Sequence, residues 1–164
     1  MNRIALLLFA IAPLIADPVR IAAGMVSGAA GDDPAIRVYK GIPYAKPPVG
    51  DRRWKAPQSP DDWSGTLDAT KFSAPCMQTE YPKTSIYYSP LDPTSEDCLY
   101  LNVWTGAKTA SERRPVMVWI HGGGYTRGSG ATPTYNGENL AKKGVVVVTI
   151  NYRLGIFGFF AHQS

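Results

Sequence analysis

Alternation of apolar and polar residues marks the clearest element of the chain. Residues 99–104 alternate, and the apolar positions on one face are Leu99, Leu101 and Val103. Successive side chains of a strand point to opposite faces of its sheet. The pattern therefore predicts a strand that is buried on one side.

Two further apolar runs, residues 116–120 and 145–150, do not alternate. Continuous runs rich in β-formers are typical of interior strands that are covered on both faces. Between them, Asn136 is expected to cap a short helix over residues 138–143, and Gly144 to end it. A strand, a helix and a second strand indicate a right-handed, parallel βαβ unit. The fold class that follows is α/β with a mixed sheet.

The first half of the chain has weaker periodicity. Residues 36–40 form a short run typical of a strand, and it leads into residues 41–50, which contain three prolines. Proline has no backbone N–H and a fixed φ, so this segment is expected to be an extended surface loop. Residues 55–95 show no sustained period and are interpreted as a long irregular excursion. Such excursions usually carry a function or a covalent tie.

The amino terminus has the pattern of a targeting segment. A single positive charge at Arg3 precedes the apolar residues 4–16, and the small Ala16 stands before Asp17. This pattern predicts a secretory signal peptide over residues 1–16, cleaved near Ala16, and a secreted or periplasmic mature chain. The apolar run is shorter than the roughly 18 residues that a spanning helix needs, so no stable membrane anchor is expected after cleavage. A retained anchor is the alternative.

Export bears on the two cysteines, Cys76 and Cys98. In an oxidising compartment, an even number of cysteines is consistent with one disulfide, which would enclose residues 77–97. Two free, buried thiols are the alternative.

Composition and charge narrow the function classes. The chain has 164 residues, 45% of them hydrophobic, and its 16 glycines and 14 prolines favour turns and short strands. Its net charge of +4 comes from scattered basic residues. Nucleic-acid binding needs a denser basic stripe together with a reader motif, so no nucleic-acid partner is expected.

The chemistry is concentrated in residues 121–125, His-Gly-Gly-Gly-Tyr, directly after a predicted strand. Glycines let backbone N–H groups approach a ligand closely, and such a turn at a strand end favours binding of an anion. A phosphate site is not supported, because no P-loop is present and Arg127 stands where a dinucleotide motif has its third glycine. The other use is an oxyanion hole for acyl transfer. A tight turn without chemistry is the remaining alternative.

Four ordered segments carry a resemblance to a known family. They are residues 41–50 (GIPYAKPPVG), 95–104 (SEDCLYLNVW), 121–125 (HGGGY) and 151–155 (NYRLG). Together they resemble the type-B carboxylesterase and cholinesterase family. The resemblance implies that residues 17–164 are the amino-terminal portion of an α/β-hydrolase fold with a mixed, mostly parallel sheet, truncated before the nucleophile elbow. It implies a small-molecule carboxylic ester as substrate, no cofactor and no metal.

The resemblance also implies roles for particular residues. Gly123 and Gly124 would donate the backbone N–H groups of the oxyanion hole, and Gly122 would let the turn form. Tyr125 would be a wall of the gorge or have a plain packing role, and His121 would be structural rather than a base. The family's first disulfide corresponds to Cys76 and Cys98, and its structural ion pair to Arg53 and Glu96.

The family's nucleophile, acid and base are not found in these 164 residues. No G-x-S-x-G motif is present, and Ser129, between two glycines, has Arg127 and Ala131 at the elbow positions. The available histidines, His121 and His162, follow no suitable nucleophile. The expectation is a serine esterase in the full-length protein and no turnover by this chain alone. A catalytically inactive, cholinesterase-like binding module and a non-functional truncated product are the alternatives.

The loop between the two cysteines bears on one class of substrate. The disulfide loop contains tyrosines at positions 81, 87 and 88 but no tryptophan. In the cholinesterase branch a tryptophan of this loop forms the cation site, so a choline-type substrate has no support here.

Overall fold

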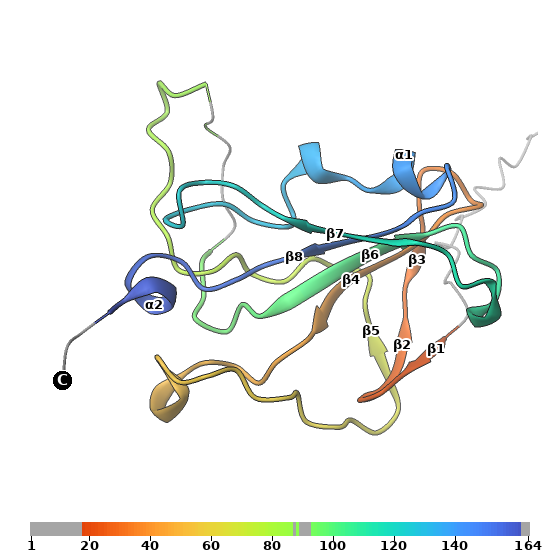
Figure 1. Ribbon diagram of the computed structural model, residues 1–164, viewed down its shortest axis with the longest axis horizontal. Helices are drawn as coiled ribbons and strands as arrows, with labels where there is room; N and C mark the ends of the chain where they lie inside the picture. The colour runs from red at the N-terminus through yellow and green to blue at the C-terminus, as the bar shows by residue number, and fades with distance from the viewer. Residues whose placement is uncertain (1–17, 87, 89–92, 162–164) are drawn as a thin grey trace, which may run out of the picture.

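Two β-sheets form the body of the molecule. The structure is a computed structural model that describes residues 18–86, 88 and 93–161, and Figure 1 shows the arrangement of its elements. The predicted signal peptide, Tyr87 and His162 lie outside the described residues. In the part that is described, no helix is long and apolar enough to cross a membrane.

The larger sheet has five strands in the order β3-β4-β6-β8-β7. Its strands are β3 (Ala29–Ala30), β4 (Arg37–Pro43), β6 (Tyr100–Thr105), β7 (Val116–Ile120) and β8 (Val146–Ile150). The smaller sheet has the order β1-β2-β5 and consists of β1 (Val19–Ile21), β2 (Gly24–Ser27) and β5 (Thr66–Asp68).

The predicted parallel pair is present, since β7 and β8 run parallel over five residue pairs. The sheet is mixed, as expected, but the described residues do not make it mostly parallel. The pairings β3 with β4, β4 with β6 and β6 with β8 are all antiparallel. A parallel pair needs a crossover connection, and among the described strands of this sheet only β7 and β8 are joined by one that contains an α-helix.

That crossover contains α1 (Glu138–Ala141), which is two residues shorter than predicted. The predicted cap is wrong by one residue, because Gly137 occupies the N-cap position and makes no side-chain cap hydrogen bond. The Asn136 side chain, one residue earlier, accepts a hydrogen bond of 2.9 Å from the N–H of Glu138. The helix ends at Ala141 with Lys142 as its C-cap, and Gly144, with φ of +90°, is the last residue of the turn that follows. The remaining helices are short: η1 (Gly50–Arg52), η2 (Ala110–Glu112), η3 (Pro133–Tyr135) and α2 (Gly155–Phe159).

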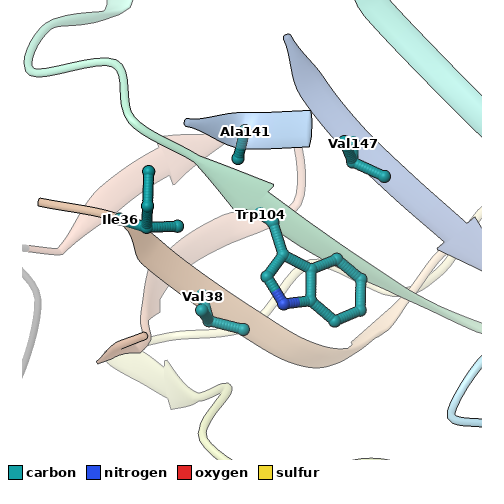
Figure 2. Close-up of a cluster of buried hydrophobic side chains, with 5 residues drawn as sticks. All are labelled: Ile36, Val38, Trp104, Ala141 and Val147. Atoms are coloured by element: carbon teal, nitrogen blue, oxygen red, sulfur yellow. The ribbon is translucent and has the colours of Figure 1, made fainter. Parts of the chain in front are cut away.

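Both faces of β6 are covered, so its predicted one-sided burial is wrong. Trp104 lies in a cluster with Ala141 of α1, shown in Figure 2 together with Ile36, Val38 and Val147. On the other face, Leu101 and Val103 pack against a cluster between the two sheets, formed by Val26, Tyr39, Ile42 and Ala69. The buried Asn102 donates to the hydroxyl of Thr149 at 2.9 Å, which allows a polar residue on the more deeply buried face.

The predicted interior position of β7 is also wrong for the described residues. β7 pairs with β8 alone and forms an edge of the larger sheet, and all five of its residues are exposed. β8 is interior in the sheet, but its burial alternates, with Val147 and Thr149 as its buried residues. Both strands therefore have apolar side chains that the described residues leave exposed or only partly buried.

The proline-rich segment over residues 41–50 is partly strand. β4 continues to Pro43 through a register shift after Tyr39, and Gly41 has φ of +70° there. The N–H of Gly41, which the shifted ladder leaves free, donates to Asn102 Oδ1 at 3.0 Å. At Pro43, β4 pairs with β6 alone, because β3 pairs only with Arg37 and Val38, so proline lies at an edge of the sheet, where it is tolerated.

Candidate functional site

The glycine turn, residues 121–125, begins where β7 ends. Gly123 and Gly124 have φ of +124° and +60°, and Tyr125 also has a positive φ of 60°. A Cβ at position 123 would lie 1.9 Å from the carbonyl oxygen of Arg127, so only glycine fits there. Gly122 has no positive φ and no atom within 4 Å of an added Cβ, so sterics do not require glycine at that position.

The N–H groups of Gly123 and Gly124 have no hydrogen-bond acceptor among the described residues. The turn is instead held through the carbonyl of Gly123, which accepts from the N–H of Thr126 at 3.2 Å and from its hydroxyl at 3.1 Å. Two unpaired donors next to each other favour an acceptor with negative charge. Residues 121–125 form one wall of a hollow of about 530 Å³, together with Tyr152 and Phe159.

His121 supports the turn from within. Its side chain is buried, its ring stacks on Tyr152 with centroids 4.4 Å apart, and Tyr152 donates to the carbonyl of His121 at 2.7 Å. Nδ1 lies 2.9 Å from the carbonyl of Gly122, and Nε2 has no partner in the described part of the chain. Burial lowers the pKa of His121, which favours the neutral ring. These contacts fit the structural role that was expected for it.

Tyr125 projects into solvent, with 63% of its surface exposed. Its ring packs against Phe159 of α2 at 4.7 Å, and both side chains face the same hollow as the glycines. Tyr125, the last residue of the turn, therefore lines the hollow and also packs against Phe159.

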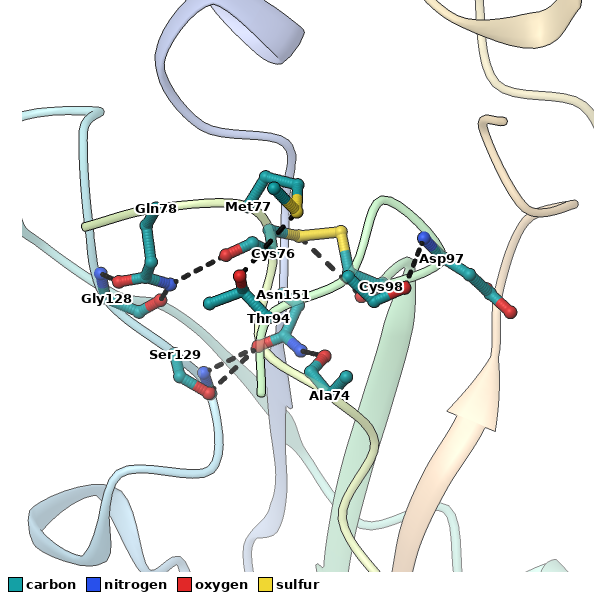
Figure 3. Close-up of a disulfide and its surroundings, with 12 residues drawn as sticks. Ala74, Cys76, Met77, Gln78, Thr94, Asp97, Cys98, Gly128, Ser129 and Asn151 are labelled. Atoms are coloured by element: carbon teal, nitrogen blue, oxygen red, sulfur yellow. Dashed lines mark hydrogen bonds between the residues drawn. A yellow bond between two sulfur atoms is a disulfide. The ribbon is translucent and has the colours of Figure 1, made fainter. Parts of the chain in front are cut away.

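The two cysteines form a disulfide, with Cα atoms 5.0 Å apart, so the alternative of two free thiols is wrong. Both sulfur-bearing side chains are buried in a cluster with Ala45, Leu99 and Leu154. Figure 3 shows the bond and its surroundings. The disulfide thus anchors both ends of the loop over residues 77–97 next to β6.

Arg53 and Glu96, expected to pair, are joined by two hydrogen bonds of 2.6 and 2.7 Å. The hydrogen bonds from the guanidinium lower the pKa of Glu96, and the same pairing raises the pKa of Arg53. A bidentate pair of this kind fixes orientation as well as distance. It joins the segment that follows η1 to the end of the disulfide loop.

Two amide side chains near the disulfide make contacts that the sequence did not predict. Asn151 accepts from the N–H of Gly130 at 2.8 Å and from the hydroxyl of Ser129 at 3.3 Å, and it donates to the carbonyl of Ala74 at 3.3 Å. Gln78 contacts Gly128 in a similar way (Figure 3). Asn151 belongs to one of the four family-like segments, whereas nothing in the sequence around Gln78 distinguishes it.

A second hollow, of about 600 Å³, also adjoins the glycine turn. Gly122 and Gly123 line it together with Gln78, and the aromatic walls come from three tyrosines: Tyr81, Tyr88 and Tyr135. The Tyr81 ring is covered by the guanidinium of Arg127 at 4.5 Å. Two of the three tyrosines of the disulfide loop thus face the turn.

Comparison with known proteins gives concordant results. Residues 16–164 match the profile of a family described as the carboxylesterase family. The chain is 49% identical over 141 residues to the fumonisin B1 esterase of Sphingopyxis macrogoltabida, with 86% of this chain and 25% of that protein covered. It is 51% identical over 130 residues to the para-nitrobenzyl esterase of Bacillus subtilis (strain 168), with 79% and 26% covered.

A similar fold is found among solved structures. A carboxylesterase of Geobacillus stearothermophilus, whose crystals were studied at pH 6.8, superposes with a TM-score of 0.75 at 45% identity. The match covers 87% of this chain and 27% of that protein. The chain therefore spans about a quarter of the length of the curated relatives it matches.

Proposed function

Because the chain belongs to the carboxylesterase family, we propose that the whole protein hydrolyses carboxylic esters and that the glycine turn binds the oxyanion of the tetrahedral intermediate. The described residues are part of an α/β-hydrolase fold. The observation that carries the proposal is the pair of N–H groups at Gly123 and Gly124, which have no acceptor among the described residues.

Negative charge develops on the carbonyl oxygen when a nucleophile adds to an ester. Donors that are already in place when this happens stabilise the transition state without having to reorganise. The backbone at Gly123 and Gly124 is fixed by the steric fit of Gly123 and by the two hydrogen bonds to its carbonyl. Two donors held in this way fit an oxygen that becomes more negative in the transition state.

The nucleophile is the second part of the proposal. The 164 residues contain no G-x-S-x-G motif, so a serine elsewhere in the full-length protein would attack the ester, with a histidine as base and an acidic residue to orient it. The tetrahedral intermediate would collapse to an acyl-serine and release the alcohol. Water would then add to the acyl-serine, and the carboxylic acid and the free serine would be released. This chain would contribute the binding of the oxyanion to both steps.

Aryl ester hydrolysis by the full-length protein tests the proposal. With p-nitrophenyl acetate we expect turnover, and complete loss of it after treatment with a fluorophosphonate, which labels activated serines. The 164-residue chain by itself is the control and should show no turnover. A folded full-length protein without esterase activity would refute the proposal, as would turnover that the fluorophosphonate leaves unchanged.

We also propose that the protein is exported, with cleavage after Ala16. The support is the sequence of residues 1–16 and the presence of a disulfide, which persists in oxidising compartments. Sequencing of the mature amino terminus should begin at Asp17. A mature protein that begins at Met1 would contradict this.

A further inference from the structure

Gln78 holds the backbone of Gly128 by both sides of its amide. Its Nε2 donates to the carbonyl of Gly128 at 2.7 Å, and its Oε1 accepts from the N–H of the same residue at 2.7 Å. Nε2 also donates to the carbonyl of Cys76 at 3.0 Å. Figure 3 shows these three contacts, which use both hydrogens of Nε2.

Gly128 in turn lies directly against the glycine turn. A Cβ at position 128 would be 2.3 Å from Nδ1 of His121 and 2.6 Å from the carbonyl oxygen of Gly122, so the two backbones touch here. The preceding residue makes the same approach, because the carbonyl of Arg127 occupies the space beside the Cα of Gly123. Residues 127–128 therefore pack directly against the glycine turn, whose N–H groups are proposed to bind the oxyanion.

Residues 127–128 are themselves held mainly from the disulfide loop. Besides the bonds from Gln78, the Arg127 guanidinium contacts the carbonyl of Glu80 and the hydroxyl of Thr79, each at 3.4 Å. Gln78 is two residues from Cys76, whose disulfide fixes the start of the loop. Of these contacts, the Gln78 bonds are the shortest and the only ones to the backbone of Gly128.

We infer that Gln78 is a positioning residue. It fixes the positions of the N–H groups of Gly123 and Gly124, because it holds residues 127–128 against the glycine turn. This inference rests on the proposed function. A displacement of about 1 Å in a catalytic constellation can lower the rate roughly 10²-fold. Loss of the Gln78 bonds would leave substrate binding intact and weaken the stabilisation of the oxyanion.

The amide is the group that these contacts require. It is both donor and acceptor, and Gly128 presents one of each. In Gln78→Glu the size is kept and the bond from the Gly128 N–H survives. Carboxylate oxygens would then face the carbonyls of Cys76 and Gly128, which cannot donate to them. Gln78→Ala removes all three bonds.

The test compares these variants of the full-length protein with p-nitrophenyl acetate as substrate. We expect kcat to fall at least tenfold in Gln78→Ala and Gln78→Glu, with KM within about twofold of the wild-type value. Affinity for an aryl trifluoromethyl ketone, whose serine adduct carries an oxyanion, should fall by the same factor as kcat/KM. A residue that merely supports folding would not produce this parallel loss.

Gln58→Ala is the matched control, because the Gln58 side chain is exposed and makes no hydrogen bond in the described part of the chain. It should leave both measurements unchanged. A wild-type protein without activity would refute the proposed function. An active wild type with unchanged kcat in both Gln78 variants would refute the role of Gln78 alone, as would failure of both variants to fold.

Discussion

Gly123 and Gly124 occupy neighbouring positions of the turn but differ in what a side chain would meet. At Gly123 a Cβ would collide with the carbonyl of Arg127, whereas at Gly124 it would meet nothing within 4 Å and only the φ of +60° is unfavourable. A left-handed φ alone costs a non-glycine residue roughly 1–2 kcal/mol. The backbone at Gly123 must move to accept a side chain, and that at Gly124 need not.

Gly123→Ala in the full-length protein should therefore lower kcat by about 10²–10³, the usual effect of losing one oxyanion donor. Gly124→Ala should have a smaller effect. Gly65→Ala is the control, because Gly65 also has a positive φ (+76°) and open space around it, but it lies next to β5. The measurement is kcat of the wild type and the three variants, from steady-state kinetics with an aryl ester. Equal kcat for Gly123→Ala and Gly65→Ala would contradict the assignment of the turn.

Arg53 and Glu96 give a prediction about pH. Their hydrogen bonds lower the pKa of Glu96 below its ordinary value of 4.5. The pair thus stabilises the fold above pH 4.5, and this contribution is lost as the pH falls through the lowered pKa. At pH 7, Glu96→Gln should unfold at a lower urea concentration than the wild type, and the gap should close below pH 4.5. A gap that is independent of pH would show that the charge of Glu96 is not what matters.

At the scale of elements, the disulfide loop is the part that ties the fold to the turn. The disulfide lowers the conformational entropy of the unfolded chain by an amount that depends on the separation of Cys76 and Cys98, which is 22 residues. A cross-link over a loop of this length stabilises a fold by about 3 kcal/mol. Replacement of both cysteines by serine in the full-length protein should lower the free energy of unfolding by about this amount, measured by urea denaturation. An unchanged unfolding midpoint would contradict the estimate.

Elements with a strong sequence pattern were predictable, and short ones were not. β6, β7, β8 and α1 correspond to the predicted strands and helix, because each has a run of apolar residues or a capping signal. β1, β2, β3 and β5 have two to four residues each, too few for any periodicity to be visible. Their positions depend on pairing with strands that are distant in the sequence.

The position of a strand within the sheet was harder to predict than its existence. An apolar run predicts burial, but β7 is an exposed edge among the described residues. At the site, too, a contact between distant residues could not be predicted. Consecutive glycines indicated the turn, whereas Gln78 acts on a residue 50 positions away, and no local pattern records such a contact.

For the molecule as a whole, the exposed strand β7 has a testable consequence. Its residues, including Val116, Val118 and Ile120, are 43–64% exposed and apolar. An apolar edge strand, which has a partner on one side only, favours association with other chains. The 164-residue chain alone should bind the dye ANS and self-associate in size-exclusion chromatography, and Val118→Lys should reduce both. A monodisperse chain that does not bind ANS would contradict this.

We propose above all that this chain is part of an ester hydrolase and that the backbone N–H groups of Gly123 and Gly124 bind the oxyanion. The most direct measurement is a crystal structure of the full-length protein with a trifluoromethyl ketone bound to its nucleophile. We predict that the negatively charged oxygen lies about 2.7–3.1 Å from both backbone nitrogens, the range of oxyanion-hole hydrogen bonds. An adduct whose oxygen points away from residues 123–124 and is bound by other groups would contradict the claim.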